Sequence, residues 1–310
     1  MQPGTDPARK WIDQGKLAYQ QMQLSEAYAH FEKAVTADPG SVEARLCFGV
    51  ICLFQYQNGS TDLIPEFYLA TEEPSWSEDD ISAEIERVRE ALATLNATHG
   101  RRAEENLLRA IELDRGNALA MEYLAYLYFD WLDNDTDSPG ATRASRLTEA
   151  KHWYKQILEI YPEHRFANYV CGVIDWKRAF ELIRSSGTFP LPLPSEEVRQ
   201  SLHSQVTPLL DEAVRNLLRA LEIDPEDPYP SRYMSLVKDL QSYVAATKEE
   251  SSRASAEAGD WNRRTKQRPR SGAISFAPVE QTGNVAPQLF PPDPKWMIPP
   301  PPPPPPPPLK

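Results

Sequence analysis

The stretch ENLLRAIELDRGN at residues 105–117 recurs, with few changes, as RNLLRALEIDPED at residues 215–227. Each copy places apolar residues at helical spacing and then reaches a turn signal containing Asp with Gly or Pro. Self-similarity within one chain is the signature of repeat architectures. The sequence therefore predicts a protein built from repeated helical units.

Two further copies of the pattern occur, EAYAHFEKAVTADPG at residues 26–40 and EAKHWYKQILEIYPE at residues 149–163. Every copy carries a small residue, a large apolar residue four positions later, and a small or β-branched residue three positions after that. Steps of four and three put these side chains on one face of an α-helix. The sets, each followed by its turn residue, are Ala27/Phe31/Ala34/Pro39, Ala103/Leu107/Ala110/Arg115, Ala150/Tyr154/Ile157/Pro162 and Ala213/Leu217/Ala220/Pro225.

A second helix is expected upstream of each copy. Small residues occupy equivalent places in these upstream segments, namely Gly15, Gly49, Ala125 and Gly172. Glycine inside a helix costs about 1 kcal/mol relative to alanine, so its presence needs a structural reason. We expect two antiparallel helices to cross closely at these positions.

Residues 8–41 resemble the tetratricopeptide repeat (TPR), a helix–turn–helix unit of about 34 residues with the pattern W-x2-L-G-x2-Y, A-x3-F and P. The matching residues are Trp11, Gly15, Ala27, Phe31, Ala34 and Pro39. Gln14 and Ala18 depart from the pattern, which has leucine and tyrosine at these places. The resemblance implies an all-α protein, a right-handed α-α superhelix of the TPR-like solenoid type.

The register predicts five degenerate repeats in a solenoid at residues 8–266, preceded by a flexible N-terminus at residues 1–7. The extra length falls between the first and second helices of three repeats, and the last repeat has a polar second helix that is expected to cap the array. The repeats are residues 8–41, 42–117, 118–164, 165–227 and 228–266, with insertions at about 57–99, 131–146 and 186–205. We expect helices from Ser77 and over SEEVRQSLH within the insertions, and a loop over residues 131–146.

Residues 267–310 form a proline-rich tail that is expected to be disordered. They hold 16 of the 30 prolines and end in PPPPPPPPPPLK. Ten consecutive prolines cannot enter a helix and adopt polyproline II, roughly 31 Å long at about 3.1 Å per residue. The tail is predicted to be a semi-rigid spacer or a ligand.

Composition narrows the classes of function. A formal charge of −12 and a pI near 5.0 disfavour nucleic-acid binding through a general basic surface. The sequence shows neither an apolar leader nor an apolar run long enough to span a membrane, so we expect a cytoplasmic protein. The three cysteines are an odd number without a CxxC pattern, which indicates neither a disulfide framework nor a zinc site.

No constellation of catalytic residues is apparent in the sequence. The five histidines lie outside HExxH, Cys–His and GxSxG contexts, and no Gly-rich phosphate loop is present. The acidic loop DNDTDSPG (residues 133–140) lacks the glycine and glutamate that an EF-hand needs at its sixth and twelfth positions. The sequence therefore predicts no enzyme, no metal site, no cofactor and no nucleic-acid partner.

The resemblance implies a protein–protein interaction scaffold that binds an extended or helical segment of another protein. In the family, the first helices of the repeats line a concave face that holds the ligand. The corresponding positions here give a candidate partner-binding set that is rich in aromatic side chains: Leu46, Val50, Leu53, Phe54, Tyr126, Phe129, Phe166, Tyr169, Val173 and Trp176. One branch of the family grips a C-terminal carboxylate with Lys and Asn in its first repeats. Ile12 and Lys16 stand at those places, so a chaperone-tail ligand is not expected.

Two interpretations of these aromatic residues stay open. They form a groove that docks a proline-rich segment of the same chain, either FPLPLP (residues 189–194) or the decaproline. Alternatively they pack between stacked helices, which is the more common fate of aromatic residues at helical spacing. Other classes of function are a helical-repeat RNA-binding protein and an accessory subunit of an enzyme or envelope assembly. An RNA reader needs regular polar and basic residues on its reading face, whereas this face is apolar with mixed charge.

Overall fold

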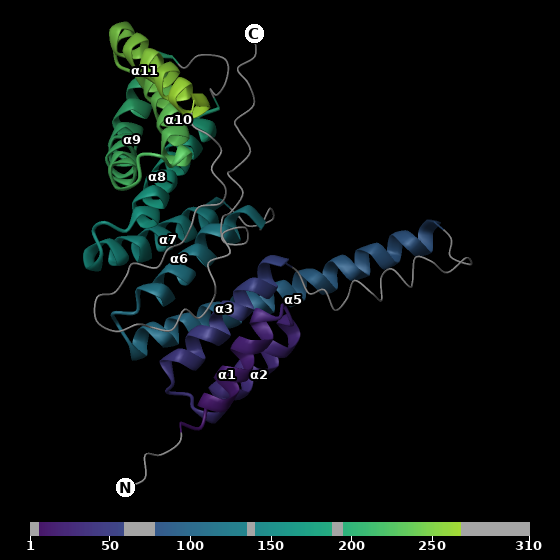
Figure 1. The fold of residues 1–310 in the computed structure, drawn as a ribbon. Helices are drawn as coiled ribbons and strands as arrows, with labels where there is room; N and C mark the ends of the chain where they lie inside the picture. The colour runs from purple at the N-terminus through teal and green to yellow at the C-terminus, as the bar shows by residue number, and fades with distance from the viewer. Residues whose placement is uncertain (1–5, 59–77, 135–139, 188–194, 268–310) are drawn as a thin grey trace. The chain divides into compact units, whose positions relative to one another are not determined.

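Every regular element in the described part of the chain is an α-helix (Figure 1). The computed structural model describes residues 6–58, 78–134, 140–187 and 195–267. Its helices are α1 (Arg9–Gln20), α2 (Leu24–Ala37), α3 (Val42–Asn58), α5 (Glu78–Leu113), α6 (Ala118–Asn134), α7 (Gly140–Ile160), α8 (Arg165–Ser185), α9 (Glu196–Ile223), α10 (Pro228–Val244) and α11 (Lys248–Gln267). The predicted all-α fold class is confirmed for these residues.

The helices group into two compact units, one ending at Leu127 and the other beginning at Tyr128, inside α6. In the first unit α1 packs on α2, α2 on α3, and α3 on α5. In the second unit α7 packs on α8, α8 on α9, α9 on α10, and α10 on α11. Within each unit a helix therefore contacts its neighbour in sequence, as in a solenoid.

Glycines lie where paired helices cross, and a larger residue would collide with the partner helix. A Cβ atom would lie 2.5 Å from a ring carbon of Phe31 at Gly15, 2.8 Å from Leu107 Cγ at Gly49, and 2.7 Å from Leu217 Cγ at Gly172. The three partner side chains are fully buried. Each is the large apolar residue of the repeat pattern, so the predicted close crossing is confirmed for α1–α2, α3–α5 and α8–α9.

The turn after α2 is fixed by two side chains that bond to backbone amides. Gly40 N donates to Asp38 Oδ1 at 2.9 Å, and Ala44 N donates to Ser41 Oγ at 3.2 Å. The first bond stabilises the turn, and the second caps the N-terminus of α3. Helix α3 therefore begins at Val42, where the second repeat was expected to start.

The same pair of bonds recurs in later turns of the chain. The equivalent contacts are Gly116 N to Asp114 Oδ1, Ala120 N to Asn117 Oδ1, Glu226 N to Asp224 Oδ1, and Tyr229 N to Asp227 Oδ1. Before α8 the capping acceptor is His164 Nδ1, which receives a bond from Ala167 N at 3.2 Å. These caps place the starts of α6, α8 and α10 at Ala118, Arg165 and Pro228.

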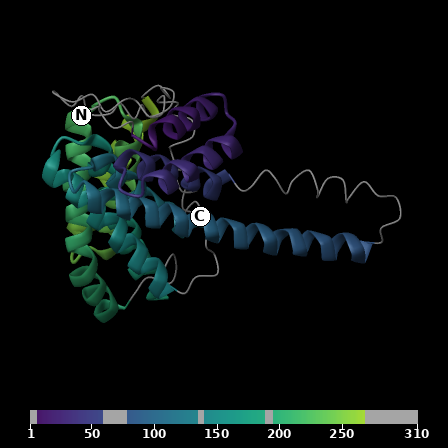
Figure 2. The same ribbon diagram turned by 90° about the horizontal axis from the view of Figure 1, so that it is seen from below.

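Two of the insertions lengthen second helices instead of forming separate ones. Helix α5 has 36 residues, about 54 Å at 1.5 Å per residue, and Figure 2 shows its N-terminal part extending beyond the other helices of its unit. Helix α9 has 28 residues and includes the segment SEEVRQSLH. The prediction of helix in both insertions is confirmed, and each of these helices continues without interruption into the repeat's own second helix. Gly100 and Pro208 each lower the local stability of a helix, but both lie inside a continuous helix.

The insertion at residues 131–146 also contains more helix than expected. Residues 131–134 complete α6 and residues 140–146 begin α7, so the predicted loop is wrong at both ends. The segment FPLPLP and residues 268–310 lie outside the described residues, and the conformations expected for them stay predictions.

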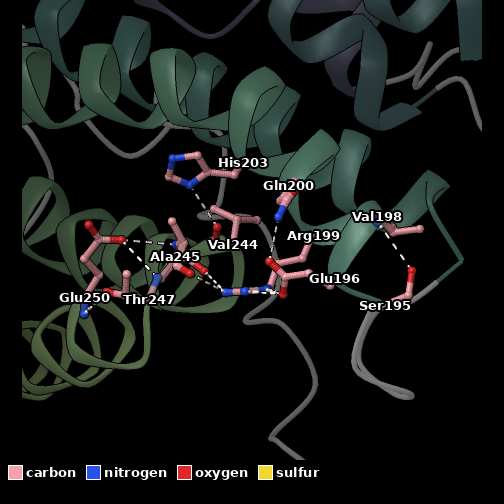
Figure 3. Close-up of polar contacts among 11 residues, drawn as sticks. Ser195, Glu196, Val198, Arg199, Gln200, His203, Val244, Ala245, Thr247 and Glu250 are labelled. Carbon is pink, nitrogen blue, oxygen red and sulfur yellow. Dashed lines mark hydrogen bonds and ion pairs between the residues drawn. The ribbon is translucent and has the colours of Figure 1, made fainter.

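The first turns of α9 hold the end of α10 in place (Figure 3). Arg199 donates from Nη1 to the carbonyl oxygens of Ala245 and, at 3.0 Å, Ala246. His203 Nδ1 lies 3.0 Å from the carbonyl oxygen of Val244. Carbonyls at a helix C-terminus have no partner within the helix, and a cation there is favourable. The insertion of the fourth repeat therefore caps the first helix of the fifth.

The turn from α10 to α11 is closed by a second set of contacts. Glu250 N donates to Thr247 Oγ1 at 3.1 Å, and Thr247 N donates to Glu250 Oε2 at 3.3 Å (Figure 3). This reciprocal pair is a capping box, which satisfies amides at the start of α11. Together with Arg199 and His203 it fixes the last helical hairpin against α9.

Candidate functional site

The residues predicted to bind a partner are almost all buried. Tyr169 is half-buried, and the remaining nine are Leu46, Val50, Leu53, Phe54, Tyr126, Phe129, Phe166, Val173 and Trp176. Their side chains fill the spaces between helices. Partner binding by this set stays a prediction, and any contact with a partner has to involve the more exposed side chains around it.

In the first unit, the first helices α1 and α3 are joined by charged and aromatic contacts. Lys16 Nζ lies 2.5 Å from Glu43 Oε1, and Arg9 Nη1 lies 3.2 Å from Glu43 Oε2. The rings of Tyr19 and Phe54 have centroids 5.6 Å apart. Phe54, a predicted binding residue, therefore packs against the preceding repeat.

In the second unit, aromatic side chains of α8 and α10 form a continuous cluster around Tyr233. The Tyr233 ring centroid lies 5.7 Å from that of Tyr169 and 5.4 Å from that of Trp176. Trp176 stacks on Phe180 at 5.6 Å, and Tyr169 lies 6.4 Å from Tyr229. Tyr233 is only 1% exposed, whereas Tyr169, Phe180 and Tyr229 are half-buried. The cluster thus has a buried centre and a partly exposed rim.

The partly exposed side chains of this region define a surface that we call the α8–α10 face. It consists of Tyr169, Lys177 and Phe180 of α8 together with Tyr229, Arg232, Leu236 and Asp239 of α10. The α10 residues recur at steps of three or four, which puts them on one side of the helix. The ring contact between Tyr229 and Tyr169 joins that side to α8.

The α10 part of this face was not in the predicted set. Tyr229, Arg232, Leu236 and Asp239 hold the same places in the fifth repeat as Phe166, Tyr169, Val173 and Trp176 hold in the fourth. Extending the register by one more repeat would have found them. The change from apolar to charged residues at these places hid the correspondence.

Two charged groups on the α8–α10 face lack partners among the described residues. Neither Arg232 nor Asp239 forms an ion pair or hydrogen bond within that part of the chain. Partial burial raises the pKa of the Asp239 carboxyl, since desolvation disfavours its charged form. Lys177 is placed over the ring of Phe129, with Nζ 4.6 Å from the ring centroid. The face therefore combines aromatic rings with charges of both signs.

Trp176 adds a buried donor to the same region. Its side chain is 7% exposed, and Nε1 is buried without a hydrogen-bond partner in the described residues. Leaving a buried donor unsatisfied costs about 1–3 kcal/mol.

A buried ion pair elsewhere in the second unit has a structural role. Lys151 Nζ of α7 lies 2.6 Å from Asp175 Oδ1 of α8 and 3.1 Å from Glu212 Oε1 of α9. The Asp175 side chain is fully buried. Three consecutive helices are therefore tied together by one ammonium group.

Other kinds of site are not evident among the described residues. No group of His, Cys, Asp and Glu side chains in those residues is arranged to hold a metal ion. Cys47, Cys52 and Cys171 are buried free thiols, and burial raises the pKa of the Cys171 thiol to about 12. None of the described helices has the length and apolarity needed to cross a membrane.

Comparison with known proteins gives matches at the level of structure. No protein-family model matches the chain, and no curated protein matches it in sequence. The crystal structure of MamA is similar with a TM-score of 0.48 and 13% identity, covering 87% of this chain and 99% of that one. A TPR protein of Thermus thermophilus has a TM-score of 0.36 and 16% identity, covering 74% of this chain and 98% of that one. A TPR-repeat protein of Bacteroides fragilis has a TM-score of 0.33 and 16% identity, covering 76% of this chain and 100% of that one.

TM-scores below 0.5 are too low to assign a class of protein. The class is therefore assigned from the helix pairs and turns of this chain. Paired helices cross at Gly15, Gly49 and Gly172, and recurrent Asp-centred turns connect successive pairs. These features define an all-α helical-repeat protein.

Proposed function

We propose that the chain is a non-catalytic protein-interaction scaffold that binds an extended or helical segment of a partner protein along its first helices. The α8–α10 face is the main contact surface in this proposal. The observation that carries it is the partly exposed aromatic rim beside Arg232 and Asp239, whose charges are unpaired among the described residues.

The chemistry of this face suits recognition of a peptide. Aromatic and arginine side chains are enriched in the energetically dominant parts of protein interfaces. Arg232 offers a planar set of donors for backbone carbonyls or carboxylates, and Asp239 offers an acceptor. Such a surface binds a segment whose apolar side chains are interspersed with polar groups.

Affinity capture from extracts of the source cells, read by mass spectrometry, tests the proposal. We expect Arg232→Glu to lose partners that the unaltered chain retains, because it reverses the charge of an arginine on the face. Arg253→Glu is the matched control, since Arg253 is an exposed arginine on α11, outside the face. Equal retention of the same partners by both variants would contradict the proposal.

The same proposal includes a location in the cytoplasm. The buried free thiols Cys47, Cys52 and Cys171 are compatible with a reducing compartment. Fractionation of the source cells tests this part, and recovery of the protein with the membrane or the exported fraction would refute it.

A further inference from the structure

We propose that the α8–α10 face is occupied in cis by the end of the same chain, the decaproline at residues 299–308 with Leu309 and Lys310. This inference rests on the proposed function, because it names a ligand for the same face. The tail would then compete with partner proteins for the scaffold.

The aromatic rim matches the way in which polyproline is recognised. Proline-rich segments dock on aromatic surfaces because the preformed polyproline II helix loses little entropy on binding. On the α8–α10 face, Tyr169, Phe180 and Tyr229 present three half-buried rings around the buried Tyr233. Successive rings of the cluster are spaced 5.4–6.4 Å apart. These rings are in contact with one another, so the pyrrolidine rings of a polyproline helix would rest on the exposed edges of Tyr169, Phe180 and Tyr229.

The hydrogen-bonding groups are complementary as well. A polyproline segment has carbonyl acceptors but no N–H donors, and its carbonyls form no internal hydrogen bonds. The face supplies a donor, the guanidinium of Arg232, which has no partner among the described residues. A ligand made of proline therefore leaves no donor of its own unsatisfied on this surface.

One charge pair distinguishes this tail from a neutral proline segment, on a face that itself carries two cations, Lys177 and Arg232, and one anion, Asp239. Residues 268–310 carry a formal charge of +2, whereas the whole chain carries −12. Lys310 follows the prolines directly, apart from Leu309. Asp239 is the acidic residue of the face, and an ion pair with Lys310 would fix the direction of the bound segment.

The lengths of the segments permit this contact. Residues 268–298 connect α11 to the decaproline, and 31 residues span up to roughly 100 Å when extended. Helix α10 is about 25 Å long for its 17 residues. The decaproline, at about 31 Å, is comparable with α10. The tail can therefore reach the face and cover it along its length.

Paramagnetic NMR on the full chain tests the docking. A nitroxide label on Leu309→Cys reports proximity, because the native thiols are buried and buried thiols are inert to labelling. We expect loss of amide signal intensity along the α8–α10 face, centred on Leu236 and Asp239. Undiminished α8 and α10 signals would overturn the proposal.

Charge exchange provides the specific control. Asp239→Lys should restore the lost amide signals, because it places two positive charges together. Adding Lys310→Asp to that variant should weaken the signals again. A purely structural effect of Asp239→Lys would not be reversed in this way. Asp260→Lys makes the same charge change on α11, where Asp260 forms an exposed pair with Arg263, and should leave the broadening unchanged. Absence of rescue by the double variant would overturn the pairing of Lys310 with Asp239.

Mixing experiments separate docking in cis from docking between copies. Isotope-labelled chain without nitroxide is mixed with unlabelled chain that carries it. Broadening confined to the single-chain sample supports the proposal, and equal broadening in the mixture assigns the contact to a second copy and overturns it. If the tail does not dock but capture still depends on Arg232, the proposed function stands and only this inference fails.

Discussion

At the scale of single residues, the fold depends on positions where no side chain fits. A Cβ atom at Gly172 would approach Leu217 Cγ to 2.7 Å and the backbone oxygen of Ala213 to 3.1 Å. Both are packed atoms of the facing helix, so relief requires α8 and α9 to separate. Glycine is needed there because of its size, although it lowers intrinsic helix propensity.

We predict that Gly172→Ala destabilises the protein by about 1–2 kcal/mol, since overpacking outweighs the gain in helix propensity. Urea denaturation followed by circular dichroism measures the change. Gly259→Ala is the matched control, because its nearest neighbour is the flexible Arg263 side chain at 3.6 Å and it should be neutral or stabilising. Equal stabilisation by both substitutions would show that α8 and α9 do not cross closely at Gly172.

His164 provides a prediction about pH. Burial, aided by the positive charge of Arg165, lowers the pKa of His164 from 6.5 to about 4, and its Nδ1 accepts the bond that caps α8. A depressed pKa in the folded state means that the unfolded chain binds the proton more readily. Stability contributed by neutral His164 is therefore present above about pH 6.5 and is lost as the pH falls towards 4.

We expect His164→Asn to remove this loss, because Asn117 performs the same capping at the start of α6. The difference in unfolding free energy between the variant and the wild type should change by on the order of 1–3 kcal/mol between pH 7 and pH 4. Denaturation curves at a series of pH values measure it. Parallel pH profiles for the two proteins would contradict the role of His164.

Single-residue features differ in how far the sequence predicts them. The crossing glycines were predictable because glycine weakens a helix, so its recurrence at one place in the helical pattern points to a close approach of the partner helix. The exposure of the predicted binding residues was not predictable, because residues on one helical face can either contact a neighbouring helix or contact solvent. Phe54 and Trp176 pack against neighbouring helices, whereas the charged residues Arg232 and Asp239 of α10 contact solvent.

At the scale of elements, the insertions act as extensions of existing helices. The added turns of α9 carry Arg199, which bonds to two carbonyls at the end of α10. We predict that Arg199→Ala lowers the free energy of unfolding of the α10–α11 hairpin by about 1–3 kcal/mol, because hydrogen bonds to a charged group are lost. Hydrogen exchange should then be faster in the last turn of α10 and in α11.

The control for this prediction is Arg184→Ala. Arg184 bonds to Glu181 on the same exposed helix surface, and such pairs contribute less than about 1 kcal/mol. Its removal should leave exchange in α10 and α11 unchanged. If Arg199→Ala also leaves hydrogen exchange in α10 and α11 unchanged, the contacts from α9 do not stabilise the terminal hairpin.

Helix existence was predictable for the insertions, but helix continuity was not. The apolar spacing from Ile81 to Leu92 indicated a helix in the first insertion, and the segment SEEVRQSLH was predicted as a helix in the third. Gly100 and Pro208 each weaken a helix locally, so helix continuity through them does not follow from the sequence pattern. Packing of long second helices on α3 and on α8 outweighs one lost or weakened backbone hydrogen bond.

At the scale of the whole molecule, the charge balance bears on the choice between protein and RNA as the partner. With a formal charge of −12, the chain should not bind single-stranded RNA at about 0.15 M salt, since phosphate binding requires clustered cations. Fluorescence polarisation with a labelled oligonucleotide across a salt series measures this. Tight binding that weakens steeply with salt would favour the alternative of an RNA-binding helical-repeat protein.

The repeat architecture was the most predictable feature at this scale. Four sequence copies, with small residues upstream of each, indicated pairs of crossing helices. The grouping into two compact units was not predicted. The repeat register treats all repeats as equivalent, so it does not predict a division between Leu127 and Tyr128, inside the first helix of the third repeat.

The pairing of helices across the insertions is the claim on which the rest depends. It is tested most directly by nuclear Overhauser spectroscopy on protein with labelled leucine methyl groups. We expect cross-peaks from the Leu217 methyls to the Gly172 backbone protons and from the Leu107 methyls to those of Gly49, because these helices cross in close contact. Absence of both sets of cross-peaks in the folded protein would show that α8 does not pair with α9 and that α3 does not pair with α5.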